Sequence, residues 1–324
     1  MTAFFTRICA SLAMATALLG GMSAHADGYP DKPITMVVPF AAGSGTDQQA
    51  RRVAQALSAL YKIPVIVDNR GGASGFIASQ YVAKAAPDGY TMLMTTNTTH
   101  AANEHLFKKL PYDPVKDFTP VALLSKGHML LIVNAESPYH SLADLLAAAR
   151  RSPGKLNFGS GSSSSRVASE LLKQMAAVDM VNVPYKSNPM AITDLLGGQV
   201  DFMFCDAPTA LPQVKGGKLR AIAVSGPNRL AAVPQVPTVD EQGVKGYDMS
   251  YWFAAYLPPG APPAITARLN EMLLKASATP EVLAAQALAS DEPATSTPEQ
   301  LARFQASESE KWGRVIRAAG IEPE

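Results

Sequence analysis

The chain has 324 residues, of which 28 are Lys or Arg and 27 are Asp or Glu, so its formal net charge is +1. This near-neutral balance argues against a nucleic acid or another polyanion as a partner. The length suffices for one large core or for two domains of about 100–150 residues each.

The first 26 residues have the pattern of a secretory signal peptide. Arg7 is their one charged residue, an Ala- and Leu-rich apolar run follows over residues 8–22, and Ala24-His25-Ala26 fits the usual cleavage site. The run is short for a membrane-spanning helix, although a retained anchor is the alternative. No later stretch is long or apolar enough to insert in a membrane. We predict cleavage before Asp27 and a periplasmic location.

The stretch that follows predicts a strand, a Gly/Ser turn and a helix. Residues 34–38 form a short, β-branched apolar run, and residues 50–60 have apolar side chains at helical spacing. Gly43-Ser44-Gly45-Thr46-Asp47 lies between them, and Thr46 or Asp47 can cap the helix. The first N–H groups of a helix lack partners and attract anions. This turn therefore predicts an anion site, or else a turn that only connects two elements.

Strands and helices continue to alternate along the chain. Strands are predicted at residues 65–67, 91–94, 130–133, 156–158, 200–204 and 219–224. Helices are predicted up to about residue 86, from Ser141 to about residue 151, over residues 166–175, and after the Thr297 cap with its Gln300 capping box. Alternation of this kind predicts an α/β fold with parallel sheets.

A second Gly/Ser turn resembles the first one. Residues 159–165 read Gly-Ser-Gly-Ser-Ser-Ser-Ser and lie between a predicted strand and a predicted helix. In parallel α/β sheets, ligands bind at such turns beyond the carboxyl ends of the strands. A flexible linker is the alternative interpretation. Two helix N-termini that face each other across a cleft would suit a small anion with one or two carboxylates.

Many short segments of the chain, in order, resemble the Bug family, the periplasmic solute receptors of tripartite tricarboxylate transporters. The matching segments include Pro87-Asp88-Gly89-Tyr90-Thr91, Leu110-Pro111-Tyr112-Asp113-Pro114 and residues 29–34, 38–40, 69–70, 82–85, 156–160, 183–186, 198–201, 217–221 and 236–238. Together they cover nearly all of the chain after residue 26, and the set is specific although no single segment is.

The resemblance implies a type II periplasmic binding protein, in which two α/β domains close over a ligand like a Venus flytrap. We expect residues 27–124 and 228–324 to form domain 1 and residues 125–227 to form domain 2, with a two-crossing hinge near Ser125 and Ser225. The implied function is to bind a small carboxylate, such as a di- or tricarboxylate or an aromatic acid, and to deliver it to a membrane permease. The resemblance implies a monomer without a cofactor or metal.

Family ligands are held mainly by backbone N–H groups and hydroxyls of the cleft loops. Carried over by motif, the residues expected to bind the ligand are Phe40, Gly43, Ser44, Gly45, Thr46, Asp47, Ala73, Ser74, Thr96, Asn97, Thr98, Ser160, Ser162, Ser163, Arg166 and Asp206. Asp47 is equally plausible as a helix cap. Arg166 stands where the family has a histidine, and either binds a second carboxylate or lies on a solvated helix face. Cys205 replaces a common acidic residue, with Asp206 beside it.

An enzyme is the main alternative, and the sequence offers little for it. There is no G-x-S-x-G motif, no pair of histidines at metal-ligand spacing, and no P-loop lysine after either Gly/Ser turn. Cys205 is the only cysteine after residue 26, so it cannot form a disulfide within the cleaved chain, and a small buried residue is expected there. We therefore expect no catalytic activity. Two alternative functions stay open: the protein is a secreted α/β enzyme that acts on a small anion, or it is a ligand-sensing receptor for a signalling partner.

Overall fold

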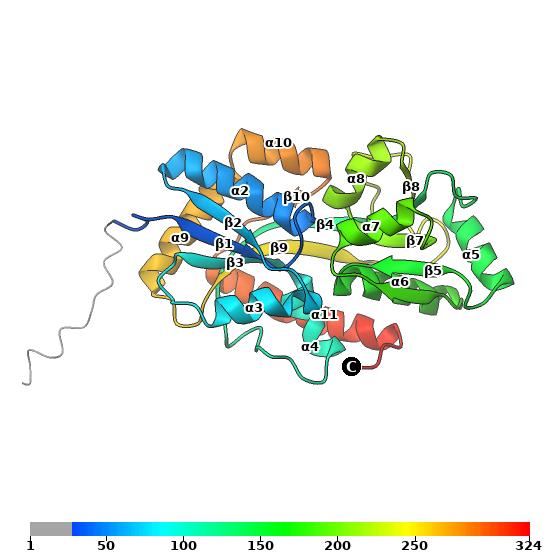
Figure 1. The fold of residues 1–324 in the computed structure, drawn as a ribbon, viewed down its shortest axis with the longest axis horizontal. Helices are drawn as coiled ribbons and strands as arrows, with labels where there is room; N and C mark the ends of the chain where they lie inside the picture. Colours follow the sequence, from blue (N-terminus) through cyan, green and yellow to red (C-terminus); the bar gives the residue numbers. More distant parts are fainter. Residues whose placement is uncertain (1–27) are drawn as a thin grey trace, which may run out of the picture.

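The computed structural model describes residues 28–324, and one mixed β-sheet runs through its length (Figure 1). The signal peptide and the cleavage site before Asp27 lie outside the described residues. The strand order is β2-β1-β3-β9-β4-β7-β5-β6, and β8 and β10 also pair with β4. The strands are β1 (Ile34–Val38), β2 (Val65–Asn69), β3 (Thr91–Thr96), β4 (Thr119–Asn134), β5 (Asn157–Ser160), β6 (Val181–Pro184), β7 (Phe202–Asp206), β8 (Leu219–Val224), β9 (Ser250–Leu257) and β10 (Glu292–Pro293).

Helices cover both faces of this sheet (Figure 1). They are α2 (Gly45–Tyr61), α3 (Phe76–Ala83), α4 (Asn103–Leu106), α5 (Leu142–Arg151), α6 (Ser163–Ala176), α7 (Asn188–Leu196), α8 (Ala207–Lys215), α9 (Pro263–Ser277), α10 (Pro280–Ala289) and α11 (Pro298–Ala318). Short helical turns lie at Ala73–Gly75 and Thr98–Ala102.

The long strand β4 joins two halves of the sheet. Residues 119–128 of β4 pair with β9, which also pairs with β3 and so completes the first half with β1 and β2. Residues 129–134 pair with β7 and β8, which form the second half together with β5 and β6. The neighbours β1–β2, β1–β3, β5–β6 and β5–β7 are parallel. The predicted α/β class is therefore confirmed, with antiparallel strands β4 and β9 between the two parallel parts.

Alternation along β1 places its side chains in two separate cores, as expected for a strand covered on both faces. Ile34, Met36 and Val38 are fully buried in a cluster with residues of α2 and α9. Val37 points to the opposite face and belongs to the cluster that contains residues of α3 and α11. Both faces of the first half are thus covered by helices, with α2 and α9 on one face and α3 and α11 on the other (Figure 1).

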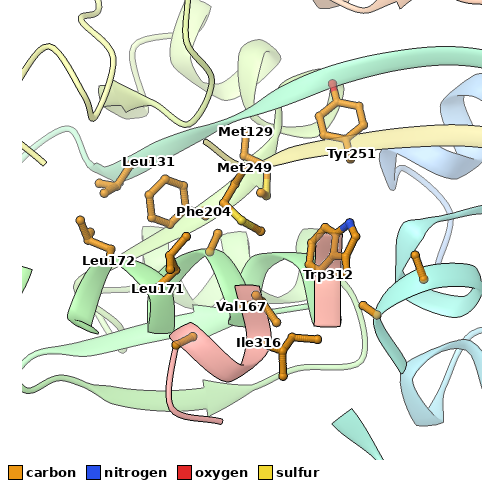
Figure 2. Packing of buried hydrophobic residues seen from close by; sticks show 14 of the residues in the cluster. Met129, Leu131, Val167, Leu171, Leu172, Phe204, Met249, Tyr251, Trp312 and Ile316 are labelled. Atoms are coloured by element: carbon orange, nitrogen blue, oxygen red, sulfur yellow. The ribbon is translucent and has the colours of Figure 1, made fainter. Parts of the chain in front are cut away.

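Helix α11 packs against both halves of the molecule. Trp312 and Ile316 near its end belong to the same buried cluster as Val167 of α6, which Figure 2 shows between the two helices. Earlier in α11, the Glu308 carboxylate accepts a hydrogen bond of 3.1 Å from the Trp252 indole N–H of β9. One continuous helix therefore contacts the second half through α6 and the first half through β9.

Local capping signals were interpreted correctly at two helices. Ser141 and Asp144 form a capping box at the start of α5, and Thr297 and Gln300 form one at the start of α11. The prediction for β4 was too short, because residues 119–129 also belong to the strand. Helix α3 ends at Ala83 rather than near residue 86.

The predicted division into residues 27–124 with 228–324, and residues 125–227, stays a prediction. Leu230, Val233 and Val236 pack in one cluster with β7 and β8 residues of the second half. Val239 N–H also donates to the Val224 carbonyl at 2.9 Å. This packing favours a later return of the chain to the first half, near Met249.

Candidate functional site

Helix α2 begins within the first Gly/Ser turn, and two N–H groups of its first turn have no hydrogen-bond acceptor among the described residues. Ser44 is the N-cap, since its hydroxyl accepts from Asp47 N–H at 3.3 Å and its carbonyl accepts from Gln48 N–H at 2.9 Å. The N–H groups of Gly45 and Thr46 have no acceptor in the described part of the chain. The predicted cap, Thr46 or Asp47, is therefore wrong by two or three residues, because the backbone already takes helical angles at Gly45.

The Asp47 carboxylate stabilises the first Gly/Ser turn by accepting hydrogen bonds from neighbouring residues. Its Oδ2 accepts from Gly43 N–H at 2.8 Å and from Arg51 Nε at 3.1 Å, and its Oδ1 accepts from the Asn69 amide at 2.9 Å. The carboxylate is almost fully buried and its oxygens are engaged by these groups. Asp47 and Gly43 therefore support the turn, and their part in ligand binding stays a prediction.

The second Gly/Ser turn opens α6 in the same way. Ser162 is the N-cap and forms a capping box with Ser165, and Ser162 also accepts from Arg166 N–H through its carbonyl. The prediction that the helix begins at Arg166 is wrong, because the serine run itself supplies the cap and the first turn. The N–H groups of Ser163 and Ser164 have no acceptor within residues 28–324.

Side chains connect the first turn of α6 directly to the end of β3 and the turn after it. The Ser164 hydroxyl accepts from the Asn97 amide at 2.8 Å and lies 3.1 Å from the Thr98 hydroxyl. The Ser163 hydroxyl donates to Asn103 Oδ1 at 2.8 Å. These contacts join elements of the two halves, so the structure shows them in a closed arrangement.

A small cavity of about 30 Å³ lies between these elements. Its polar lining consists of the N-terminal residues of α2 and α6, the Asn188 amide at the start of α7 and the Asp206 carboxylate that caps α8, and its apolar lining is mostly aromatic. The lining residues are Phe40, Ser44, Gly45, Thr46, Thr96, Thr98, Met129, Gly161, Ser162, Ser164, Asn188, Asp206, Tyr251 and Phe253. Among the described residues, no Lys, Arg or His lines this cavity.

The structure distributes the sequence-predicted residues over three places. The residues that line this cavity are Phe40, Ser44, Gly45, Thr46, Thr96, Thr98, Ser162 and Asp206. Those that line a neighbouring cavity are Ser74, Ser160, Ser163 and Arg166, and Ser162 lines both cavities. Gly43, Asp47, Ala73 and Asn97 line neither of the two cavities. The role of each residue in ligand binding stays a prediction.

Sequence reasoning missed six residues that line the cavity, namely Met129, Gly161, Ser164, Asn188, Tyr251 and Phe253. Two signals could have found some of them. Tyr251 and Phe253 alternate on one strand and therefore point to the same face. Asn188 follows Ser187 and precedes a proline, which is a typical helix start, so α7 provides a third helix N-terminus at the cleft.

The neighbouring cavity has a volume of about 240 Å³, and its lining contains the cationic residues Arg166 and Lys186. The Arg166 guanidinium forms an ion pair of 2.5 Å with the Glu324 side chain, which also lines this cavity. Ser74 on its rim has a left-handed backbone with φ of 52°, as does Ala73 with φ of 46°. Arg166 therefore does not face the cavity between the helix N-termini.

Asp206 is the one carboxylate in the main cavity and also the N-cap of α8. It accepts from Thr209 N–H at 3.3 Å and from the Asn188 amide at 2.6 Å. A Cβ added to Gly45 would collide with this carboxylate, so Asp206 lies directly against the first turn of α2. The adjacent Cys205 is fully buried, and burial raises the pKa of its thiol, with the nearby Asp206 carboxylate as the second cause.

A buried acid lies behind the aromatic wall of the cavity. The Tyr251 hydroxyl donates to Asp291 Oδ1 at 2.7 Å, and Arg52 lies 3.7 Å from Asp291 Oδ2. Burial raises the pKa of Asp291 to about 7, and the Tyr251 and Arg52 contacts oppose this rise. The arrangement fixes the Tyr251 ring at the cavity.

Comparison with known proteins places the chain in a family. A family profile described as "Tripartite tricarboxylate transporter family receptor" matches residues 49–321. Protein BugT of Bordetella pertussis (strain Tohama I) is 35% identical over 321 residues, which cover 97% of this chain and 98% of that protein.

Two similar solved structures contain a bound acid. Rpa4515 of R. palustris with adipate has a TM-score of 0.89 and 34% identity, and the match covers 91% of this chain and 100% of that one. MatC from Rhodopseudomonas palustris with bound malate has a TM-score of 0.82 and 32% identity, with 89% and 100% covered.

The fold and the cleft between helix N-termini define a solute-binding protein of the periplasmic binding protein class. The chain belongs to the tripartite tricarboxylate transporter receptor family, and the resemblance to the Bug proteins is confirmed. None of the helices among residues 28–324 is long and apolar enough to cross a membrane. The same residues contain no group of His, Cys, Asp and Glu side chains that could hold a metal ion.

Proposed function

We propose that this protein is a periplasmic receptor that binds a small carboxylate in the cavity between the two halves and delivers it to a tripartite transporter permease. The observation that carries the proposal is that residues at the starts of two helices, α2 and α6, line one cavity. Helix N-termini carry partial positive charge and bind anions without a basic side chain. Adipate and malate in the two related structures are small carboxylates.

The lining of the cavity favours a receptor over an enzyme. It contains neither His nor Cys nor Lys within the described chain, and its serines have no base beside them. A nucleophilic serine requires such a base at hydrogen-bond distance. The protein is therefore expected to release its ligand unchanged.

Thermal-shift measurements with mono-, di- and tricarboxylates test the proposal, with neutral sugars and polyamines as controls. A ligand that binds only the folded state must raise the melting temperature. At least one carboxylate should do so, and isothermal titration should give one ligand per chain. Chromatography of the recovered ligand should show no conversion. Stabilisation by sugars or polyamines alone would contradict the carboxylate proposal, and conversion of the ligand would favour the enzyme.

Delivery requires an open and a closed form, and small-angle scattering can detect both. Saturating carboxylate should lower the radius of gyration of the purified protein, because the halves close over the ligand. The mass from the same data should correspond to a monomer. Mass spectrometry of exported protein should give a chain that begins at Asp27. A lipid or a retained leader would contradict a periplasmic protein released by cleavage.

A further inference from the structure

A buried carboxylate near the main cavity has unusually few hydrogen-bond donors. Asp291 is 4% exposed and lies between the end of α10 and the short strand β10. Its Oδ1 accepts from the Tyr251 hydroxyl at 2.7 Å, whereas its Oδ2 is buried and has no hydrogen-bond partner in the described chain. Asp47 is similarly buried but accepts from three donors. Burial with few donors favours the neutral, protonated form of a carboxylate.

The charged groups that face Asp291 come from both halves of the molecule. Among the described residues, Arg52 of α2 is the one cation that faces it, and it lies 3.7 Å from Oδ2, which is too far for a hydrogen bond. Asp206 of the second half adds a negative charge that raises the pKa of Asp291 further. The other charged or histidine side chains of the adjoining strands and helices are exposed or bonded elsewhere, namely Asp47, Arg51, Lys126, His128, Lys215, Glu281 and Glu292.

Tyr251 connects Asp291 with the main cavity. It pairs with Gly127 where β9 and β4 lie side by side, and a Cβ on Gly127 would collide with the Tyr251 hydroxyl. The side chain therefore lies directly across β4, with its hydroxyl on Asp291, and the same residue lines the cavity. Asp206 lines this cavity too, and its charge already acts on Asp291. A further negative charge in the cavity must act on Asp291 in the same direction.

Arg52 also takes part in the contact between the two halves. Its guanidinium donates to Gln48 Oε1 at 3.3 Å, and the Gln48 amide donates to the Pro208 carbonyl of α8 at 3.1 Å. Helix α2 belongs to the first half, whereas α8 follows β7 in the second. The group that favours the ionised form of Asp291 is thus positioned by the closed arrangement, as is the opposing charge of Asp206.

We propose that Asp291 is a proton-binding site coupled to the main cavity, so that the receptor takes up a proton from the solvent there when it binds a negatively charged ligand. This inference rests on the proposed carboxylate-receptor function and adds its regulation by pH. The proton neutralises the Asp291 carboxylate and so removes its repulsion of the ligand. Affinity should therefore rise as the pH falls.

The size of the effect follows from the position of Asp291. Burial raises its pKa to about 7, so the carboxylate is mostly ionised in the free protein at about pH 7.5. At an effective dielectric constant of about 20, a negative charge about 10 Å away raises a pKa by about one unit. Binding near pH 7.5 should then take up about 0.5 proton per ligand, and affinity should rise about tenfold from about pH 9 to about pH 6.

Titration calorimetry on the wild-type protein measures the proton directly, with benzoate, succinate and glutarate as probes. Each acid is titrated near pH 7.5 in HEPES and in Tris, whose ionisation enthalpies differ, and the difference between the observed heats gives the number of protons taken up. These acids are ionised at that pH, so an uptake belongs to the protein. Every acid that binds should show an uptake of about 0.5 proton. Equal binding heats in the two buffers would overturn the inference.

Two variants assign the proton to a residue. Asp291→Asn has the same shape and keeps an oxygen for the Tyr251 hydroxyl, so it should abolish the uptake and bind equally well at pH 6 and pH 9. His128→Gln is the matched control, because histidine ordinarily titrates in this range and His128 does not line the main cavity. It should keep the wild-type uptake. Uptake that persists in Asp291→Asn, or that disappears in His128→Gln, contradicts the assignment.

A third variant covers the case in which Asp291→Asn fails to fold, which circular dichroism reveals. Arg52→Met removes the cation that faces Asp291, so the pH at which affinity falls should move upward by about one unit. An unmoved pH profile in this variant overturns the inference. If carboxylates bind without proton uptake, the proton site is wrong and the carboxylate receptor stands. If no carboxylate of the thermal-shift panel binds, both proposals fall.

Discussion

The Asn97 amide donates to the Ser164 hydroxyl at 2.8 Å, and this bond joins the end of β3 to the first turn of α6. Both residues are buried, and Thr98 lies against the same hydroxyl at 3.1 Å. The closed arrangement is thus held by hydrogen bonds between uncharged side chains, which ligand exchange can break at modest cost. Each such bond contributes about 0.5–1.5 kcal/mol net.

Ser164→Ala should lower the free energy of unfolding by about 1–3 kcal/mol, because the buried Asn97 amide loses its acceptor. Urea unfolding followed by circular dichroism measures the change. Ser307→Ala is the control, since Ser307 is exposed and donates only to a carbonyl of its own helix. It should change the stability by less than about 0.5 kcal/mol. Equal stability of the two variants would contradict the proposed importance of the contact.

Gly45→Ala should weaken binding of any carboxylate that stabilises the wild type by about tenfold or more. The added methyl group would collide with the Asp206 carboxylate and come within 3.2 Å of the Phe253 ring, so it obstructs closure and the approach to the N–H groups. Calorimetric titration measures the effect. Gly197→Ala serves as control, because its new methyl group makes only ordinary contacts at 3.6 Å or more. Wild-type affinity in Gly45→Ala would place the site elsewhere.

Arg166→Ala should leave ligand affinity within about threefold of the wild type, since Arg166 faces the neighbouring cavity and pairs with Glu324. The loss of stability should stay below about 1 kcal/mol, as is usual for a partly exposed ion pair. Arg229→Ala, which breaks the exposed pair with Glu241, is the matched control. A tenfold loss of affinity in Arg166→Ala alone would show that the ligand extends into the second cavity.

His100 should make the protein less stable in acid. Its ring is fully buried between Tyr256 and Phe118, at centroid distances of 4.1 and 4.6 Å, and burial lowers its pKa to about 3. Between about pH 6.5 and pH 3, the unfolded chain binds a proton that the native state excludes, so stability falls as the pH falls.

His100→Phe should remove this dependence. Between pH 7 and pH 5, the variant should lose about 2 kcal/mol less unfolding free energy than the wild type. Unfolding in urea at the two pH values gives the difference. His140→Gln, which changes an exposed histidine, should keep the wild-type dependence. If His100→Phe kept it as well, the ring would be protonated in the native state.

Features set by neighbouring residues could be predicted from the sequence. Strand β1 has the predicted bounds, and the capping boxes that begin with Ser141 and Thr297 form as expected. Each of these depends on hydrogen bonds or alternation within a few residues. The two Gly/Ser turns were found for the same reason.

Features set by distant residues could not be predicted. Strand β4 is extended to Thr119 because β9, more than 100 residues later, pairs with it. Local signals place Tyr251 on a strand and Asn188 at the start of a helix, but the strand order decides that both residues reach the cavity. Arg166 is a candidate ligand because it stands where the family has a histidine. Only the structure shows that its side chain points to Glu324.

The span of α11 across both halves restricts how the cavity can open. A wide swing that separated the halves would pull Val167 of α6 away from Trp312 and Ile316 and expose a large buried apolar surface. Sliding of α6 along the stiff helix would keep most of that surface covered. We therefore expect the cavity to open by a shear motion of a few ångströms, in which α6 slides along α11, rather than by a wide hinge rotation of the two halves.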